Sequence, residues 1–269
     1  MLSISELSRR GRESLRGKWA ETSVAILVVG IITSAPNLIL NMFTSFMTAL
    51  SGGSSAAIGA AIFIAMAVIG LSVLCLLWLV FVSEPIKYGL AASFLNMVRK
   101  GRFDFSDLLS AKKRYLHVVG TMLLPDICIT ACVLVALVVG LILSSPVSFL
   151  NDIDMTLSYV LIALGVCVYV AGLVYAIILS CAFAMIPFIA YDNPDKSATE
   201  VMRMSCRMMK GRKVHLFLFG LSFIGWYIVG ILALFIGIYP VSAYVYSSLT
   251  HFYESIKDEG TVTESIMVA

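Results

Sequence analysis

Charged side chains are scarce in this sequence of 269 residues: Asp, Glu, Lys and Arg make up 13%, and hydrophobic residues make up 60%. A soluble domain usually carries about 25% charged residues. A water-soluble fold of this length cannot hide so much apolar surface, because its exterior needs polar groups to cover it. The shortage of charge argues against a soluble globular protein, a disordered chain and a disulfide scaffold. It favours an all-α, polytopic transmembrane bundle.

Catalytic and metal-binding signatures are missing as well. The sequence contains no H-E-x-x-H, no Walker motif and no G-x-G-x-x-G that follows a strand. Most of its six cysteines lie inside apolar stretches, where cysteine behaves as a small hydrophobe, and no set of His and carboxylate residues completes a metal site. The formal net charge of +3 is too small for a nucleic-acid-binding protein. We therefore expect no metal, no cofactor, no nucleic-acid partner and no enzymatic activity.

Six apolar stretches approach or exceed the length of about 20 residues that a helix needs to cross a bilayer. The sixth is short and rich in Tyr and Ser, so three interpretations stay open for it: a full span, a re-entrant segment or an interfacial segment. The six stretches are residues 22–42, 56–82, 116–143, 157–190, 214–238 and 239–253.

Lys and Arg are absent from the connections that follow the first, third and fifth stretches. All 19 basic residues precede the first stretch, join the second to the third or the fourth to the fifth, or follow the sixth. Because basic residues stay on the cytoplasmic side, this pattern predicts two cytoplasmic termini and an even number of spans. The predicted regions are a basic N-terminal helix (1–19), a six-span domain (20–256, with cytoplasmic connections 84–115 and 191–213) and a cytoplasmic tail (257–269).

Two cytoplasmic segments, residues 3–18 and 195–211, are predicted to form helices with one apolar and one basic face. Ser3 and Glu6 fit a capping box at the start of the first. We expect both helices to lie along the inner leaflet, where their basic faces contact anionic lipid headgroups. Topology signalling alone, or packing on neighbouring cytoplasmic helices, are the alternatives. The basic residues concerned are Arg9, Arg12, Arg16, Arg203, Arg207 and Lys210.

These two segments also resemble each other. Residues 6–18 align with residues 200–212 without a gap, and each run precedes an apolar stretch. The likeness hints at two related halves of three spans each, an arrangement found in many transporters.

One acidic residue is expected at depth in the membrane. Asp126 lies about ten residues into the third stretch and follows Pro125, which removes a backbone donor and can kink a helix. An acid at mid-membrane costs about 2.5 to 3.5 kcal/mol on insertion scales and is a functional candidate by default. Asp126 either lines a proton or cation path or accepts a hydrogen bond from a nearby hydroxyl group.

Several motifs resemble the bacterial integral membrane family known as domain of unknown function 975. They are Leu15-Arg16-Gly17-Lys18-Trp19, Pro85 with Gly89 and Arg99-Lys100-Gly101, Pro187-Phe188, Ala198-Thr199-Glu200, Met209-Lys210-Gly211, Leu221-Ser222-Phe223-Ile224-Gly225-Trp226, and Tyr239-Pro240. The resemblance covers nearly the whole chain and implies a multi-pass protein of the bacterial plasma membrane, but no activity. The family usually shows a Pro-Tyr pair before its last span, whereas here Tyr239 precedes Pro240.

The function that the sequence favours is non-enzymatic: a binding or scaffold protein, or one that interacts with lipid. The cationic amphipathic helices and the lack of a catalytic set motivate this hypothesis. The alternative is a small transporter or permease subunit that uses Asp126, because the proline breaks and the half-repeat are compatible with transport. The lipid bilayer, with its anionic headgroups, is the partner that the sequence predicts.

Overall fold

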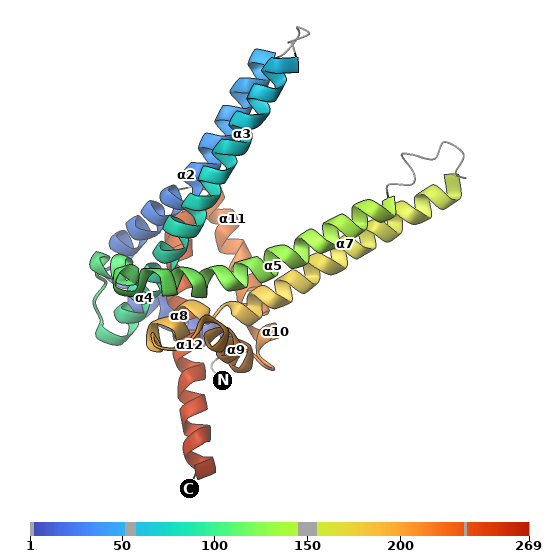
Figure 1. The fold of residues 1–269 in the computed structure, drawn as a ribbon. Helices are drawn as coiled ribbons and strands as arrows, with labels where there is room; N and C mark the ends of the chain where they lie inside the picture. The colour runs from blue at the N-terminus through green and yellow to red at the C-terminus, as the bar shows by residue number, and fades with distance from the viewer. Residues whose placement is uncertain (1–2, 52–57, 145–154, 234–235, 269) are drawn as a thin grey trace. The chain divides into compact units, whose positions relative to one another are not determined.

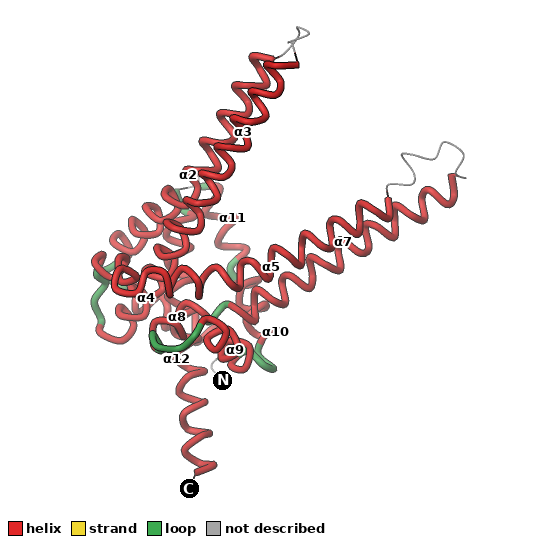
Figure 2. The backbone as a smooth tube through the Cα atoms, viewed as in Figure 1, coloured by secondary structure: helices red, strands yellow, loops and turns green. Residues whose placement is uncertain are grey.

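The computed structural model describes residues 3–51, 58–144, 155–233 and 236–268, and within these ranges the regular structure is helical (Figures 1 and 2). The predicted all-α class is therefore confirmed. The elements are α1 (Ile4–Leu15), α2 (Trp19–Ser51), α3 (Ile58–Trp78), the π-helical turn η1 (Leu79–Ser83), α4 (Glu84–Lys100), the 3₁₀ segment η2 (Phe105–Arg114), α5 (Tyr115–Ser144), α7 (Met155–Phe183), α8 (Ile186–Asp192), α9 (Ala198–Met208), α10 (Lys213–Ser222), α11 (Ile224–Leu232) and α12 (Ile238–Val268).

Five helical segments in the described ranges are long and apolar enough to cross a membrane. Many of their large side chains are exposed, for example Met42 at 73% and Leu232 at 78%. Lipid is the natural cover for such a surface. These segments correspond to the first five predicted stretches, and α12, which contains residues 239–253, is not among them. The segments are Trp19–Ala49, Ile64–Lys100, Tyr115–Leu143, Thr156–Asp192 and Lys213–Leu232.

The chain divides into two compact units. Unit 1 comprises residues 1–119 and 222–269, and unit 2 comprises residues 120–221. The basic N-terminal helix α1 thus belongs to the same unit as α2 to α4 and α12. Residues 257–268 are likewise the end of α12 and not a separate element.

In unit 1, α2 and α3 form an antiparallel hairpin (Figure 1). Pro36 lies inside α2, and its missing N–H leaves the carbonyl of Ile32 without its helical donor. The indole N–H of Trp78, on α3, donates to this carbonyl at 3.0 Å. The thiol of Cys75 donates to the Pro36 carbonyl at 3.3 Å. The proline break is thus satisfied from the neighbouring helix, as backbone groups in lipid require.

The chain continues from α3 through η1 into α4, and η2 then folds back onto α4. The two elements touch at Gly89, where a Cβ atom would lie 2.0 Å from the carbonyl oxygen of Leu108. Further along, the amide of Asn96 donates to the Asp107 carboxylate at 2.7 Å. Tyr88 to Met97 are buried almost without interruption, so α4 belongs to the core of unit 1.

Helix α12 is the second core helix of unit 1. From Ile238 to Lys257 every residue is buried or half-buried, and α12 packs on α1, α2, α4 and α11. Three of its fully buried residues are small and polar, which explains why the sixth stretch is less apolar than the others: they are Ser247, Ser248 and Thr250. Such residues allow helices to approach closely in a membrane protein.

The first residues of α12 contact the first part of α2. The Tyr244 ring lies 6.3 Å from the ring of Trp19, at the start of α2. A Cβ atom placed on Gly30 of α2 would lie 3.6 Å from Cε1 of the Tyr239 ring. The section from 239 to 244 therefore runs beside the first third of α2, and the section from Ser247 onward packs on α1. Residues 239–253 thus form part of one continuous helix that is covered by α2 and α1 within unit 1.

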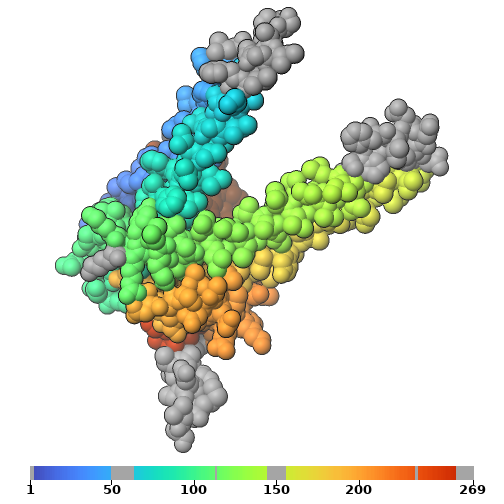
Figure 3. Space-filling view, viewed as in Figure 1, coloured from blue at the N-terminus to red at the C-terminus, as the bar shows by residue number. Residues whose placement is uncertain are grey.

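Unit 2 is built on a hairpin of α5 and α7, which lie side by side (Figure 3). Small residues permit this contact: a Cβ on Gly172 would lie 2.1 Å from the Cβ of Ala136, and a Cβ on Gly140 would lie 3.0 Å from the carbonyl oxygen of Gly165. The long fourth stretch is divided near its end: α7 stops at Phe183, and Pro187 sits in the first turn of α8.

Candidate functional site

Helix α1 packs its apolar face on α12. Leu7 and Leu15 are completely buried in unit 1. Between them, the Gly11 carbonyl accepts a hydrogen bond from Ser247 at 3.0 Å, and a Cβ on Gly11 would lie 2.1 Å from Ser248 Oγ. The apolar face of α1 is therefore covered by α12. Of the alternatives, packing on a neighbouring helix is the one observed.

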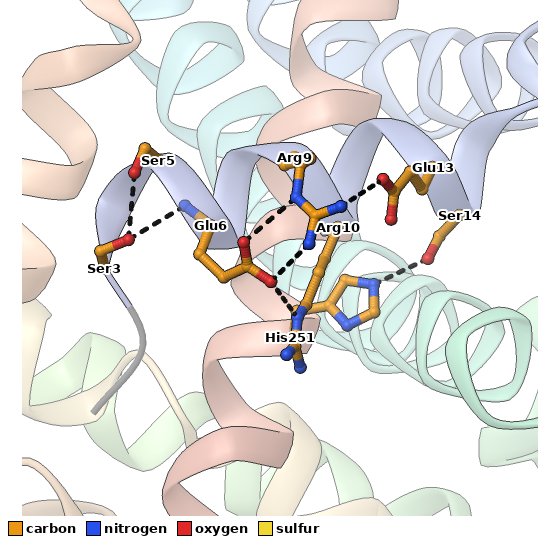
Figure 4. Close-up of polar contacts among 8 residues, drawn as sticks. All are labelled: Ser3, Ser5, Glu6, Arg9, Arg10, Glu13, Ser14 and His251. Atoms are coloured by element: carbon orange, nitrogen blue, oxygen red, sulfur yellow. Dashed lines mark hydrogen bonds and ion pairs between the residues drawn. The ribbon is translucent and has the colours of Figure 1, made fainter.

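The Arg side chains near the start of α1 are largely neutralised within the helix (Figure 4). Arg9 contacts Glu6 at 2.9 Å and Glu13 at 3.0 Å, and Arg10 contacts Glu6 at 3.0 Å. Hydrogen bonds from Arg9 and Arg10 lower the pKa of Glu6 to about 2. Glu6 therefore faces these arginines and does not complete the capping box, although Ser3 Oγ does accept from the Glu6 N–H at 3.2 Å.

Arg12 and Arg16 differ in their surroundings. The Arg12 guanidinium lies 6.0 Å from the centre of the Tyr244 ring, a cation–π contact. The same ring is surrounded by Trp19, Phe223 and Trp226, with centroid distances of 6.3, 4.9 and 6.3 Å. Arg16, the residue after the end of α1, is exposed, as Arg12 is.

A half-buried histidine joins α12 to α1. His251 Nε2 lies 2.7 Å from Ser14 Oγ, a hydrogen-bond distance (Figure 4). Burial at this interface lowers the pKa of His251, and the positive charge of Arg10 lowers it further, whereas Glu13 and a backbone hydrogen bond to Arg10 oppose the shift. At pH 7 the imidazole of His251 is therefore neutral when α1 is packed on α12.

Acidification is expected to weaken the docking of α1. The pKa of His251 is lower in the folded protein than the value of 6.5 in the unfolded chain. Its contribution to the stability of the folded state is therefore complete above pH 6.5 and is lost as the pH falls through the folded pKa. The melting temperature of the wild type in detergent should therefore fall more below pH 6.5 than that of His251→Gln, which keeps a polar side chain but does not titrate. Parallel curves from pH 8 to pH 5.5 would contradict this role for His251.

In unit 2, helix α9 is the counterpart of α1. It begins later than predicted, at Ala198, because Ser197 is the N-cap: the Ser197 N–H donates to the Glu200 carboxylate at 3.0 Å. This hydrogen bond also lowers the pKa of Glu200. The pattern Ser-x-x-Glu at residues 197–200 is visible in the sequence and marks this start. The outcome is a helix of Ala198–Met208 in place of the expected 195–211.

The apolar face of α9 is also covered by protein. Val201 and Met209 are completely buried, and Ser205 Oγ donates to the Ala182 carbonyl of α7 at 2.7 Å. The opposite face carries the predicted basic residues, which are all exposed: Arg203, Arg207 and Lys210.

The two basic segments, which align in sequence, also have the same local structure. Each segment begins at a Ser N-cap, buries three residues four apart and ends in a glycine with positive φ. The equivalent pairs, each separated by 194 positions, are Ser3 and Ser197, Leu7 and Val201, Gly11 and Ser205, Leu15 and Met209, and Gly17 and Gly211.

Asp126 is found within α5, as predicted, and Pro125 is buried beside it. The Asp126 residue is exposed on the surface of the helix. The apolar groove between α5 and α7 does not include it: its lining is Leu137, Gly140, Leu141, Ile162, Gly165, Val166 and Tyr169. A role for Asp126 in transport stays a prediction.

Sequence reasoning missed the importance of Tyr244 and Lys18. Tyr244 looked like one of several tyrosines in a weak span, and its ring contacts arise from segments distant in sequence. The Lys18 ammonium donates to the backbone carbonyl of Gly101, a residue distant in sequence. Glu84 and Lys87 form an ion pair at 2.6 Å.

The described part of the chain is thus a helical protein with several segments able to cross a membrane and with basic helices packed beside them, the composition of a multi-span membrane protein. The chain belongs to the family described as "Protein of unknown function (DUF975)", which matches residues 1–260. The resemblance inferred from the sequence motifs is therefore confirmed. No curated protein and no solved structure matches this chain.

Proposed function

We propose that this chain is a multi-pass protein of the bacterial plasma membrane that binds anionic lipid headgroups at the cytoplasmic surface and catalyses no reaction. The exposed basic face of α9 carries the proposal. Arg203 and Arg207 are exposed there and Lys210 is exposed in the turn that follows, while Val201 and Ser205 are buried on the opposite face. Since the apolar face already packs on protein, the attraction of α9 to a membrane is electrostatic. Each basic residue near an anionic leaflet contributes about 1 kcal/mol.

The proposed topology places both termini in the cytoplasm. The distribution of all 19 Lys and Arg residues supports it. The contact of α1 with α12 supports it independently, because the first helix and the end of the last helix lie together in unit 1. In the predicted six-span arrangement, the return to the cytoplasmic side runs along α12, in the interior of unit 1, and α12 contacts α1 at Ser247.

Lipid binding by α9 is expected to depend on its three charges. The full-length protein would be purified in an uncharged detergent and titrated with a short-chain phosphatidylglycerol, with phosphatidylcholine as the neutral lipid. Replacing Arg203, Arg207 and Lys210 together by Gln removes about 3 kcal/mol of attraction, so we expect affinity for the anionic lipid to fall about a hundredfold. The apparent affinity follows from the rise in melting temperature with lipid concentration.

The matched control removes charge that is already paired. Arg9→Gln/Arg10→Gln deletes two cations that contact Glu6 and Glu13, so its affinity for phosphatidylglycerol should change much less. High salt should weaken binding by the wild type, because exposed charges are screened. Equal affinities for the α9 variant, the control and the wild type would refute the proposal.

A further inference from the structure

The three positive-φ glycines of the described residues share one sequence pattern. Gly17, Gly101 and Gly211 have φ values of 80°, 67° and 77°. Each stands between two basic residues, in the tripeptides Arg16-Gly17-Lys18, Lys100-Gly101-Arg102 and Lys210-Gly211-Arg212. Positive φ is the reason for glycine at these positions, because other residues are strained there. The tripeptides lie at the C-terminal ends of α1, α4 and α9, respectively, the third one residue beyond its helix.

Glycine at a helix end explains the backbone, and favourable interaction with the helix dipole explains one or two basic residues near it. It does not explain why two such turns come together. In unit 1, the Lys18 ammonium donates a hydrogen bond to the carbonyl of Gly101, which is 83 positions away in the sequence. The first turn is thereby attached to the backbone between Lys100 and Arg102.

The paired turns, residues 16–18 and 100–102, form an open cationic surface. Arg16, Lys100 and Arg102 are exposed, and a Cβ placed on Gly17 or Gly101 would meet no atom within 4 Å. The open space leaves room for a ligand to approach both turns.

Nearby acids offset this charge only in part. The Glu254 carboxylate is held by Arg99 at 2.7 Å. The Asp104 carboxylate lies near Arg102 but accepts the Ser106 N–H at 3.0 Å as the N-cap of η2. Glu21 lies on the first turn of α2, one turn beyond Lys18. Four cations on two adjacent turns repel one another, and an anionic ligand would relieve this repulsion.

The position of the paired turns beside the start of a membrane-spanning segment indicates which class of anion binds there. Trp19 follows Lys18 directly, begins the first membrane-spanning segment and is 38% exposed. Tryptophan is enriched at the depth of lipid headgroups. A phosphate group at this depth belongs to a membrane lipid, whose acyl chains would extend along the apolar surface of α2.

We propose that the paired turns, residues 16–18 and 100–102, bind the phosphate of an anionic phospholipid headgroup. The inference rests on the proposed function, in which this protein binds anionic lipid. It assigns a second, separate site to unit 1, with Arg16, Lys100 and Arg102 as the phosphate contacts. Lys18 is a positioning residue, because its hydrogen bond to Gly101 holds the two turns together.

The test compares variants of the paired turns with the α9 variant. Each full-length protein is titrated with short-chain phosphatidylglycerol in an uncharged detergent. Lys100→Gln/Arg102→Gln is expected to weaken binding at the unit 1 site about thirtyfold, from roughly 2 kcal/mol of lost attraction. Lys100→Arg should retain wild-type affinity. Native mass spectrometry counts the bound lipids, and the double variant should retain one fewer than the wild type. Circular dichroism and melting temperature without lipid verify that the variants fold.

Two further arms separate the possible outcomes. Inorganic phosphate and glycerol phosphate should protect the wild type far less than the lipid does; equal protection would overturn assignment to a membrane lipid. The α9 variant of the preceding section reports on the proposed function alone. If it loses a lipid while Lys100→Gln/Arg102→Gln binds like the wild type, the paired turns are not a site and the proposed function stands. If neither variant loses affinity, both proposals fail.

Discussion

Gly89→Ala is expected to lower the free energy of unfolding by about 3 kcal/mol, the upper part of the usual range for overpacking. The added Cβ would lie 2.0 Å from the carbonyl oxygen of Leu108 and 2.7 Å from its Cα. Those are backbone atoms, so no side-chain rotation relieves the clash, and η2 must move away from α4. The Asn96–Asp107 hydrogen bond, which joins the same two elements, would weaken with it.

Gly70→Ala is the matched control for this prediction. Gly70 also lies in a helix of unit 1, but a Cβ there meets nothing within 4 Å. Alanine is the better helix former by about 1 kcal/mol, so this variant should be as stable as the wild type or slightly more so. Chemical unfolding in detergent, followed by circular dichroism, measures both variants. Similar stabilities for the two would show that α4 and η2 do not approach as closely as described.

Tyr244→Ala is expected to destabilise unit 1 by about 3 to 5 kcal/mol, the cost of truncating a buried aromatic side chain. Its ring touches the rings of Trp19 and Phe223 and faces the Arg12 guanidinium. Truncation therefore leaves a cavity where α1, α2, α11 and α12 meet. Tyr244→Phe keeps the ring and should stay close to the wild type.

Tryptophan fluorescence reports on this change directly, because the Trp19 and Trp226 rings both lie 6.3 Å from the Tyr244 ring. Tyr159→Ala is the control, since Tyr159 is 70% exposed and its loss leaves no cavity. If Tyr244→Ala melted at the temperature of Tyr159→Ala, the Tyr244 ring would not be the centre of this packing.

The helical class and the first five apolar segments were predictable because they depend on local composition. A run of apolar residues forms a helix in a bilayer whatever its neighbours are, since its backbone can be satisfied only internally. The effects of proline follow from the same local rule: Pro187 lies in the first turn of its helix, where its missing N–H is tolerated, and Pro36 leaves a carbonyl that needs a donor. The donor itself, Trp78, could not be read from the sequence, because it lies 46 positions from Ile32, whose carbonyl it contacts.

The candidate site was predictable only as a set of charges. The sequence identified Arg203, Arg207 and Lys210 as one face of a helix, because the helical period puts them there. It could not tell that Arg9 is paired with Glu6 and Glu13, or that Arg12 lies over Tyr244. An amphipathic pattern shows that a face will be covered but not whether lipid or protein covers it.

The sequence by itself determined that this chain is helical, rich in membrane-spanning segments and basic at particular positions, and it identified the family. These properties follow from composition, period and charge, which act over a few neighbouring residues. Only the tertiary structure decided that α12 lies in the core, that it covers the apolar face of α1, and that Lys18 meets Gly101. Such contacts join residues 83 to 236 positions apart. They depend on how side chains of complementary shape pack, which no local pattern encodes.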